Sequence, residues 1–296
     1  MTPNKSPRWS VDDLNTAMMD RRALVRGTVG AGAAMAGLAA VGMHAAGAQE
    51  ATPVAGGPPP LPAGATLLAE GLLNPRFIAV GDDGSLYVSE SGVGGDDLFY
   101  DDPFAAPASP DASPVASPVA AEPFGSRGGS GQVSKIAVDG TVSVLATGLP
   151  SYLLGFEPTG PAGIDIANGT IWLAVGGSGP ATAVMDALSN ENSVVTIDAT
   201  SGAVTFVADI GAFERSDNPH PATVDSNLYG ISVGADGTVY TADAGGNAIY
   251  AIDPTTGAFA VVAVLDDIPL PEGAQGPPTL QSVPTGIAKI QPAASS

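Results

Sequence analysis

Alternating apolar and polar residues recur in three segments of the chain that share one template. The segments are residues 75–91 (PRFIAVGDDGSLYVSES), 161–177 (PAGIDIANGTIWLAVGG) and 228–244 (LYGISVGADGTVYTADA). Each contains an alternating apolar stretch, a tight Asp-Gly or Asn-Gly turn, and a second stretch rich in β-branched and aromatic residues, which together are a strong local signature of a β-hairpin. A fourth copy begins at Val283 with the sequence VPTGIAKI. The pattern predicts a repeat of β-hairpins.

A second hairpin pattern follows each of these segments, at residues 131–147, 192–209 and 247–264. Each repeat unit then contains four antiparallel strands. Such a unit has more apolar face than it can bury alone, so it must stack on its neighbours, and radial stacking of four-stranded units gives a β-propeller. We expect an all-β fold over residues 66–296, a β-propeller of four-stranded blades with three blades and a fraction of another, and therefore an incomplete ring.

Irregular spacing between the units indicates insertions. Residues 96–130 include the stretch PASPDASPVASPVAAEP and are expected to form a low-complexity surface loop, because Pro at this density cannot continue a sheet and Ala and Ser bury little surface. Residues 210–226 are expected to cross between two blades. Residues 65–72 (ATLLAEGL) are expected to form a lone outer strand of the preceding blade, and the Gly-rich residues 128–131 are expected to be a turn.

The N-terminal segment has the pattern of an export signal. Arg21 and Arg22 open the sequence RRALVR, and a weakly apolar run rich in Ala and Gly follows. This predicts a twin-arginine-type signal peptide over residues 1–48, cleaved after Ala48. A membrane anchor is the alternative, but a stable span favours Leu, Ile and Phe over small residues. We expect a Pro-rich disordered linker at residues 49–65 and an exported protein that is extracellular, periplasmic or cell-wall associated, with no membrane contact after cleavage.

Charge and cysteine content exclude several classes of partner and site. The chain carries 30 acidic and 10 basic residues, a formal net charge of −20, so it repels the phosphate backbone of nucleic acids. Signal cleavage would remove Lys5, Arg8 and the three arginines of the signal but few acidic residues, which leaves the mature protein strongly acidic. The absence of cysteine excludes disulfides, thiolate metal sites and a cysteine nucleophile.

Aligned repeats place polar residues at one end of the blades. Glu90 and Asp243 end the second strand of their units, where the remaining unit has Val175. Carboxylate and amide oxygens from five residues are candidate ligand-binding groups, and an oxygen-only set is suited to calcium. The alternative is that Asp and Asn beside Gly cap turns by accepting backbone N–H bonds. The five candidates are Glu90, Asp225, Asn227, Asp243 and Asn247, with Glu90 and Asp243 the candidate calcium ligands.

Other side chains that attract attention have structural explanations. Tyr87, Trp172 and Tyr240 occupy the same register of the second strand, and a repeated aromatic position fills the layer between blades. His220 lies between two prolines in a loop, without a second histidine in the mature chain, and is a poor general base. We therefore assign no catalytic residue.

Several phrases carry a resemblance to a known family. The segments GLLNPRFIAVGDDGSLYVSESG, GPAGIDI, DSNLYGISVGADGTVYTADAGGNAIYAID and VPTGIA resemble the ScyD/ScyE family of exported bacterial proteins. The resemblance implies a propeller related to the NHL-repeat and gluconolactonase-like groups, and no demonstrated reaction. Similar members continue for further blades after the VPTGIA strand, whereas this chain ends in QPAASS. A short ring implies a C-terminally truncated copy or self-association through the open blade edge.

Three functions remain open at this point. The first is a non-catalytic scaffold that binds an unknown protein or small molecule, with no cofactor required. The second is a calcium-dependent hydrolase or lactonase, in which a metal-bound carboxylate cluster polarises a carbonyl and activates water. The third is a non-functional truncated copy. The residues favour a binding protein over an enzyme, because they offer no competent general base or nucleophile and the repeat fold has too few blades to supply a metal-bound carboxylate cluster. On a repeat fold, function would lie in the loops that do not repeat.

Overall fold

The computed structural model describes residues 62–100, 123–155, 157–178, 186–220, 224–271, 273 and 278–289. The predicted signal peptide, its cleavage site and nearly all of the linker lie outside these residues, as does most of the low-complexity insertion. In the described part of the chain, no helix combines the length and apolar character needed to cross a bilayer.

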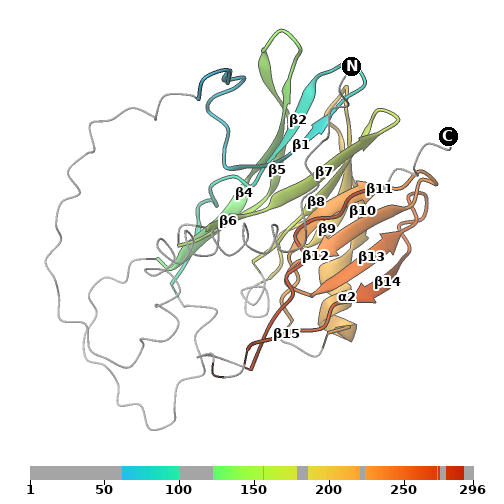
Figure 1. The fold of residues 1–296 in the computed structure, drawn as a ribbon. Helices are drawn as coiled ribbons and strands as arrows, with labels where there is room; N and C mark the ends of the chain where they lie inside the picture. Colours follow the sequence, from blue (N-terminus) through green and yellow to red (C-terminus); the bar gives the residue numbers. More distant parts are fainter. Residues whose placement is uncertain are drawn as a thin grey trace, which may run out of the picture. The chain divides into compact units, whose positions relative to one another are not determined.

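Most strands of the described residues form three large antiparallel sheets that follow one another along the chain, as the repeat predicts (Figure 1). Each has the strand order of a propeller blade, and we number them blades 1 to 3. Blade 1 consists of β1 (Pro75–Val80), β2 (Leu86–Glu90), β4 (Gly125–Ile136) and β5 (Val142–Leu154), with β3 (Asp97–Phe99) paired to β4 and β6 (Glu157–Thr159) paired to β5. Blade 2 consists of β7 (Pro161–Ala167), β8 (Thr170–Val175), β9 (Ser193–Asp198) and β10 (Val204–Asp209), and blade 3 of β11 (Leu228–Val233), β12 (Val239–Asp243), β13 (Ala248–Ile252) and β14 (Phe259–Val264).

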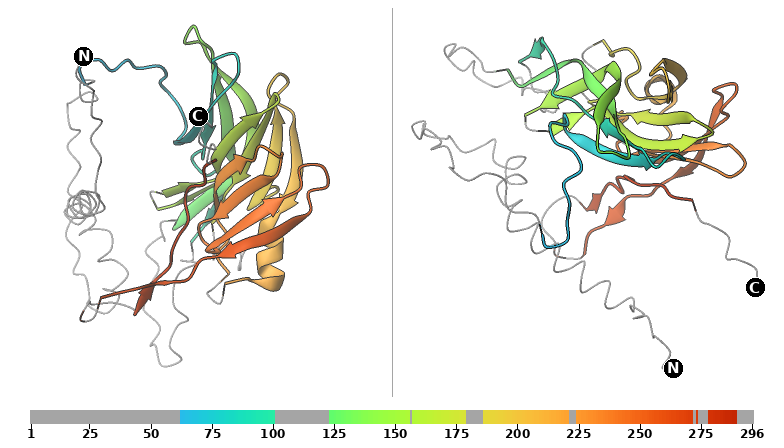
Figure 2. Two further views of the ribbon diagram at one scale, coloured as in Figure 1. Left: turned by 45° about the vertical axis from the view of Figure 1, so that its right-hand side comes forward. Right: turned by 90° about the horizontal axis from the view of Figure 1, so that it is seen from above.

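Inner strands of successive blades lie side by side, and glycine makes this possible. β1 contacts β7, and β7 contacts β11 (Figure 2). A Cβ atom added to Gly163 would lie 2.4 Å from the carbonyl oxygen of Tyr229. A Cβ on Gly230 would lie 3.1 Å from the backbone nitrogen of Ile287. Gly286 and Ile287 therefore lie against Gly230 of β11, where the first strand of a fourth blade would begin, although residues 283–289 are not in a strand.

The apolar side chains between blades form two clusters. Tyr87 and Val133 of blade 1 pack with Ile164 and Leu173 of blade 2 in the first cluster. Trp172, on the opposite face of blade 2, packs with residues of blade 3 in the second. The aromatic positions of blades 1 and 2 are thus core residues, as predicted, and the fold is an all-β propeller with three blades in the described residues.

Two local predictions differ from the structure, and the predicted crossing at residues 210–226 contains a helix. Residues 65–72 are irregular rather than a strand, and Leu67 and Leu68 are exposed, because no described strand lies where an outer strand would pair. Residues 128–131 lie within β4 instead of forming a turn, since the glycines allow register shifts and a close approach to neighbouring backbone. The crossing at residues 210–226 begins with a helix, α2 (Ile210–Asp217), capped at its N-terminus by the side chain of Asp209. A short hairpin of β15 (Ile268–Pro269) and β16 (Thr279–Leu280) follows blade 3.

Candidate functional site

Glu90 and Asp243 occupy equivalent positions, as predicted. Each is the last residue of the second strand of its blade, and Val175 ends β8 at the corresponding place. Glu90 is fully buried and accepts hydrogen bonds from the backbone N–H of Leu73 and from the side chain of Gln132, the latter at 3.1 Å. Its carboxylate therefore ties the segment that precedes β1 to the middle of blade 1.

Asp243 makes the equivalent connection in blade 3 through a larger number of hydrogen bonds. Its Oδ1 accepts from the backbone N–H of Asn227 at 2.7 Å and of Gly246 at 2.9 Å, and its Oδ2 accepts from the Ser226 hydroxyl at 2.7 Å. Burial raises the pKa of Asp243, and these donors oppose the rise. The side chain is fully buried, so it joins the segment before β11 to the turn after β12 without contacting solvent.

Two further carboxylates lie next to Asp243. Burial raises the pKa of Asp225 to about 6, and the charge of Asp243 adds to the rise. Glu214 projects from α2, is 1% exposed, and accepts the backbone N–H of Asp225 at 3.1 Å through Oε1, while its Oε2 has no hydrogen-bond partner. Burial raises the pKa of Glu214 to about 7, against the effect of the Asp225 N–H and with the help of the charges on Asp243 and Asp225.

Gly246 and Tyr250 complete this group. A Cβ on Gly246 would lie 3.0 Å from Oδ2 of Asp243 and 3.3 Å from Oε1 of Glu214, so both carboxylates lie over a residue without a side chain. The Tyr250 hydroxyl is buried and without a partner, and its pKa is raised by burial and then by the charges of Asp243 and Glu214. We call Asp225, Asp243, Glu214 and Tyr250 the blade 3 carboxylate cluster.

The five predicted site residues do not form one set of ligands. Asp225 and Asp243 come together, and Asn227 joins them through its backbone N–H. Asn247 adopts a left-handed backbone (φ 50°), and its Oδ1 accepts the N–H of Val283 at 2.9 Å, which fixes the entry to residues 283–289. The hydrogen bonds of Glu90 go to residues of blade 1 and its preceding segment.

Among the residues that the structure describes, no group of three or more His, Cys, Asp or Glu side chains is arranged to hold a metal ion. Both carboxylate oxygens of Asp243 accept hydrogen bonds, one from a hydroxyl and the other from backbone N–H groups. Calcium at Glu90 and Asp243 stays a prediction. In blade 3, Oε2 of Glu214 and the Tyr250 hydroxyl are buried without a hydrogen-bond partner.

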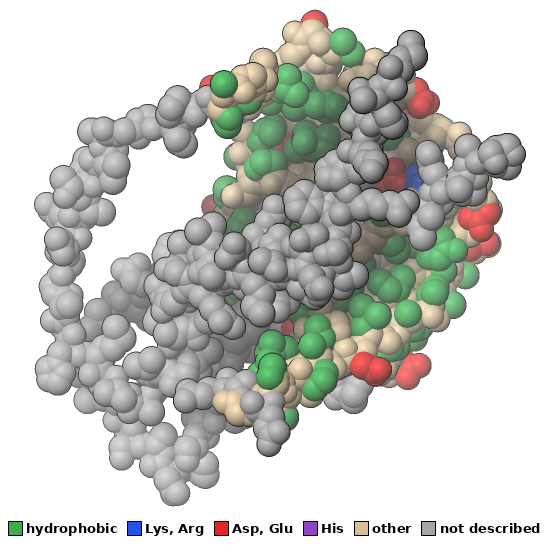
Figure 3. Space-filling model, viewed as in Figure 1, with side chains coloured by type: hydrophobic (Ala, Val, Ile, Leu, Met, Phe, Trp, Pro, Cys, Tyr) green, Lys and Arg blue, Asp and Glu red, His purple; other side chains and the backbone are tan. Residues whose placement is uncertain are grey.

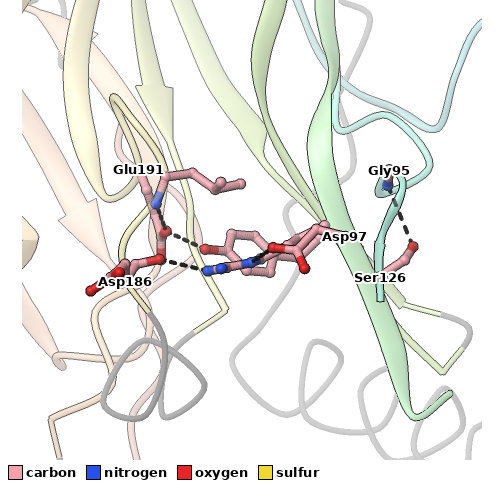
Figure 4. A network of polar contacts seen from close by, with 8 residues as sticks. Gly95, Asp97, Ser126, Asp186 and Glu191 are labelled. Atoms are coloured by element: carbon pink, nitrogen blue, oxygen red, sulfur yellow. Dashed lines mark hydrogen bonds and ion pairs between the residues drawn. The ribbon is translucent and has the colours of Figure 1, made fainter. Parts of the chain in front are cut away.

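A second polar network joins blade 1 to the loop before β9 (Figure 4). The buried Tyr152 hydroxyl donates to Oε2 of Glu191, which also accepts the Leu188 N–H at 2.9 Å. Arg127 pairs with Asp97 at 2.6 Å and donates to the carbonyl oxygen of Asp186 at 2.5 Å. Burial raises the pKa of Glu191, and its Oε1 has no hydrogen-bond partner.

Buried polar atoms without partners gather at this end of the blades. The described residues contain seven such side-chain atoms. Six belong to the blades and their connections: three lie between the second and third strands of blade 2, two lie in the connections between successive blades, and one lies in the middle of β13. Burying a polar group without a partner costs about 1–3 kcal/mol, so such atoms usually have water or a ligand nearby. The six are Thr159 Oγ1, Ser178 Oγ, Glu191 Oε1, Asn192 Oδ1, Glu214 Oε2 and the Tyr250 hydroxyl; the seventh is Oδ1 of Asp267, which lies 3.6 Å from Nε2 of His220.

Sequence reasoning missed Glu214, Glu191 and Tyr250. Glu214 lies on a helix in a crossing that does not repeat, and Glu191 belongs to a loop that widens blade 2 alone. Tyr250 occupies an apolar position of β13, so the alternating pattern gives no reason to treat it as a polar site residue. The Glu191–Asn192 pair directly before β9 was a usable signal, because Asn247 stands at the same point before β13.

No family model and no curated protein matches the sequence. Among solved structures, the chain is similar to a catalytically inactive virginiamycin B lyase from Staphylococcus aureus (15% identity, 72% of this chain and 44% of that chain, TM-score 0.34). It is also similar to a protein from Lactobacillus plantarum (16%, 66% and 44%, TM-score 0.33) and to a streptogramin B lyase (13%, 68% and 56%, TM-score 0.27).

The chain spans less than two thirds of the length of these three structures. The chain is a β-propeller protein, with four-stranded antiparallel blades and its non-repeating polar residues concentrated at one end of them.

Proposed function

We propose that this chain is an exported β-propeller of the ScyD/ScyE type that acts as a non-catalytic binding scaffold. The observation that carries the proposal is the group of unpartnered, buried oxygen atoms at one end of the blades. Ligand sites on β-propellers of this architecture would lie where loops leave the blades, and here those loops differ between blades. The binding end carries carboxylates from blades 1, 2 and 3, which favours a cationic ligand rich in hydrogen-bond donors.

The carboxylates themselves favour binding over catalysis. Asp243 accepts hydrogen bonds from backbone and hydroxyl donors at both oxygens, which fix its side chain in place. Glu191 holds the Tyr152 hydroxyl and a backbone N–H through one oxygen and offers the other. Groups fixed in this way present an acceptor of constant geometry, which is what a recognition site requires.

A thermal unfolding experiment with small probes tests the proposal. We expect arginine to raise the melting temperature and glucose at the same concentration to leave it unchanged, because a ligand that binds only the folded form stabilises it. The double variant Glu191→Gln, Glu214→Gln should lose the arginine response. The matched control Asp139→Asn removes an exposed turn carboxylate and should keep it. A response that survives the double variant, or no response in the wild type, would contradict the proposal.

A calcium-dependent hydrolase is the second candidate, and the proximity of Glu214, Asp225 and Asp243 is the observation that favours it. If it is correct, calcium chloride raises the melting temperature by several degrees, magnesium chloride does so less, and lactones or esters are hydrolysed. Asp225→Asn should then abolish both the calcium response and turnover. Absence of turnover together with an unchanged melting temperature would eliminate this candidate and leave the binding scaffold intact.

A further inference from the structure

The turn between β7 and β8 contains an asparagine that is followed by a glycine. Ala167 pairs with Thr170, so Asn168 and Gly169 form a two-residue hairpin loop. Both have a positive φ, 51° for Asn168 and 74° for Gly169, as a type I′ turn requires. Both residues are exposed. Because β8 begins at this turn and ends at the junction with β9, the turn lies at the other end of blade 2 from the candidate site.

Asn168 differs from the other asparagines that have a left-handed backbone. In the described part of the chain, five asparagines have a positive φ: Asn74, Asn168, Asn190, Asn192 and Asn247. Of these, Asn168 alone precedes a glycine, whose nitrogen has no neighbouring side chain to hinder it. Asn192 and Asn247 are buried, and Asn74 precedes a proline, whose nitrogen carries no hydrogen. Within this group, Asn168 is therefore the best placed for attack on its side chain by the following backbone nitrogen.

The reacting groups of this turn are not held by other residues. Neither the Asn168 side chain nor the Gly169 N–H makes a hydrogen bond to a described residue. A Cβ atom added to Gly169 would have no other atom within 4 Å, so the space beside its nitrogen is open. In the corresponding Asp-Gly turns, by contrast, Asp83 and Asp236 each accept the backbone N–H two residues later at 3.0 Å. A carboxylate is also a poorer electrophile than an amide.

We propose that Asn168 is a site of spontaneous deamidation in the folded protein, with water as the co-reactant. The Gly169 nitrogen loses its proton to solvent and attacks Cγ of Asn168, and the bond from Cγ to the amide nitrogen breaks and releases ammonia. The cyclic imide that results takes up water at one of its two carbonyl carbons. Opening at the former side-chain carbon gives aspartate, and opening at the backbone carbon gives isoaspartate, in which the chain continues through the side chain.

The modification changes both the charge of the surface and the geometry of the turn. Either product carries a carboxyl group that is ionised at neutral pH. Figure 3 shows acidic side chains at the periphery of the described residues, so the new charge adds to a negative surface. Isoaspartate also lengthens the backbone of a two-residue turn by one carbon, so the pairing of Ala167 with Thr170 should loosen.

Peptide mapping by mass spectrometry, after incubation of the purified protein in mildly alkaline buffer, tests the proposal. We expect the peptide that contains Asn168 to gain the mass difference between an amide and an acid, in two isomeric forms, before any other described asparagine reacts. Conversion should be faster at higher pH because the attacking nitrogen must lose its proton. Isoelectric focusing should show a first new band with one additional negative charge.

Two variants identify the residue that produces this band. Asn168→Gly keeps a turn that accepts positive φ and should abolish the first acidic band. Asn190→Gly, the control, replaces a left-handed asparagine that precedes a glutamate and should retain the band. An Asn168 that stays intact in the folded protein, or that reacts only after urea is added, would overturn the proposal, because the turn conformation would then protect it. An acidic band of unchanged rate in Asn168→Gly would do the same, since another amide would have produced it.

Discussion

The protein should lose stability as the pH rises from about 4.5 to 7, and the variant Glu214→Gln should lose most of this dependence. The pKa of Glu214 is about 7 in the fold, against an ordinary value of 4.5. Between these values the folded protein holds a proton that the unfolded chain has released. The stabilisation is complete below the ordinary pKa and disappears as the pH rises through the folded one.

The expected effect is large for a single side chain. A difference of this size corresponds to about 3 kcal/mol in the free energy of unfolding. For a domain of this length that is roughly 6 to 12 °C in melting temperature. Asp225, with a pKa of about 6, acts in the same direction over a lower range, and the two contributions are not additive because both respond to the charge of Asp243.

Melting temperatures of the wild type and Glu214→Gln between pH 4.5 and 8 provide the measurement. The glutamine keeps an oxygen for the Asp225 N–H and carries no charge, so the variant should exceed the wild type at pH 8 and match it near pH 5. Asp217→Asn is the control, since it removes an exposed carboxylate from the same helix. Parallel pH curves for wild type and Glu214→Gln would show that Glu214 titrates normally.

Exposed carboxylates in the turns make the protein less stable at low pH, where they become protonated. The pKa of Asp83 is lowered by hydrogen bonds from Ser85, first from its backbone N–H, and that of Asp139 is lowered by Thr141 in the same way. Asp198 and Asp253 repeat the arrangement with residues that follow them. Because their folded pKa values lie below 3.8, their contribution is lost as the pH falls below that value. Maximum stability is therefore expected between about pH 4 and 4.5.

These turns also explain why the fold was predictable from sequence. Asp83, Asp139 and Asp236 each precede a glycine and accept the N–H two residues later, so the turn chemistry is encoded within four residues. Alternation then fixes which side chains face the next blade. Tyr87 and Trp172 were assigned to the core on this basis, and both are buried there.

The candidate site was predictable only where it repeats. Glu90 and Asp243 were found because equivalent strands end at them, and Asp225 because it lies in a recognisable phrase. Glu214 was missed because it reaches the cluster from α2, through a contact that local sequence does not encode. The Gly-rich residues 128–131 were interpreted wrongly for a related reason: glycine permits both a turn and a bulged strand, and only the long pairing of β4 with β5 decides between them.

Replacement of Asp243 by alanine should cause the largest loss of stability among single changes at this end of the blades. The variant leaves the N–H groups of Asn227 and Gly246 and the hydroxyl of Ser226 without their acceptor. Each buried donor without a partner costs about 1–3 kcal/mol, while removal of a buried charge returns part of this. We expect a net loss of about 3–5 kcal/mol in the free energy of unfolding, measured by urea denaturation at pH 7.

Two companion variants separate the structural task of Asp243 from its charge. Asp243→Asn keeps an oxygen acceptor and should lose much less stability than Asp243→Ala. Because the variant removes a negative charge near Glu214, it should also lower the pKa of Glu214 toward 4.5. Carboxyl chemical shifts in a pH titration would detect this change. Asp236→Ala, at an exposed turn of the same blade, should change stability little. If Asp243→Ala lost no more free energy of unfolding than Asp236→Ala, the Asp243 carboxylate would not stabilise the segment before β11. Its positional equivalence with Glu90 would then not reflect a shared contribution to stability. If instead calcium restored the stability of Asp243→Asn, the cluster would be a cation site in which the charge of Asp243 is replaceable, because the remaining carboxylates Glu214 and Asp225 would then supply the ligands.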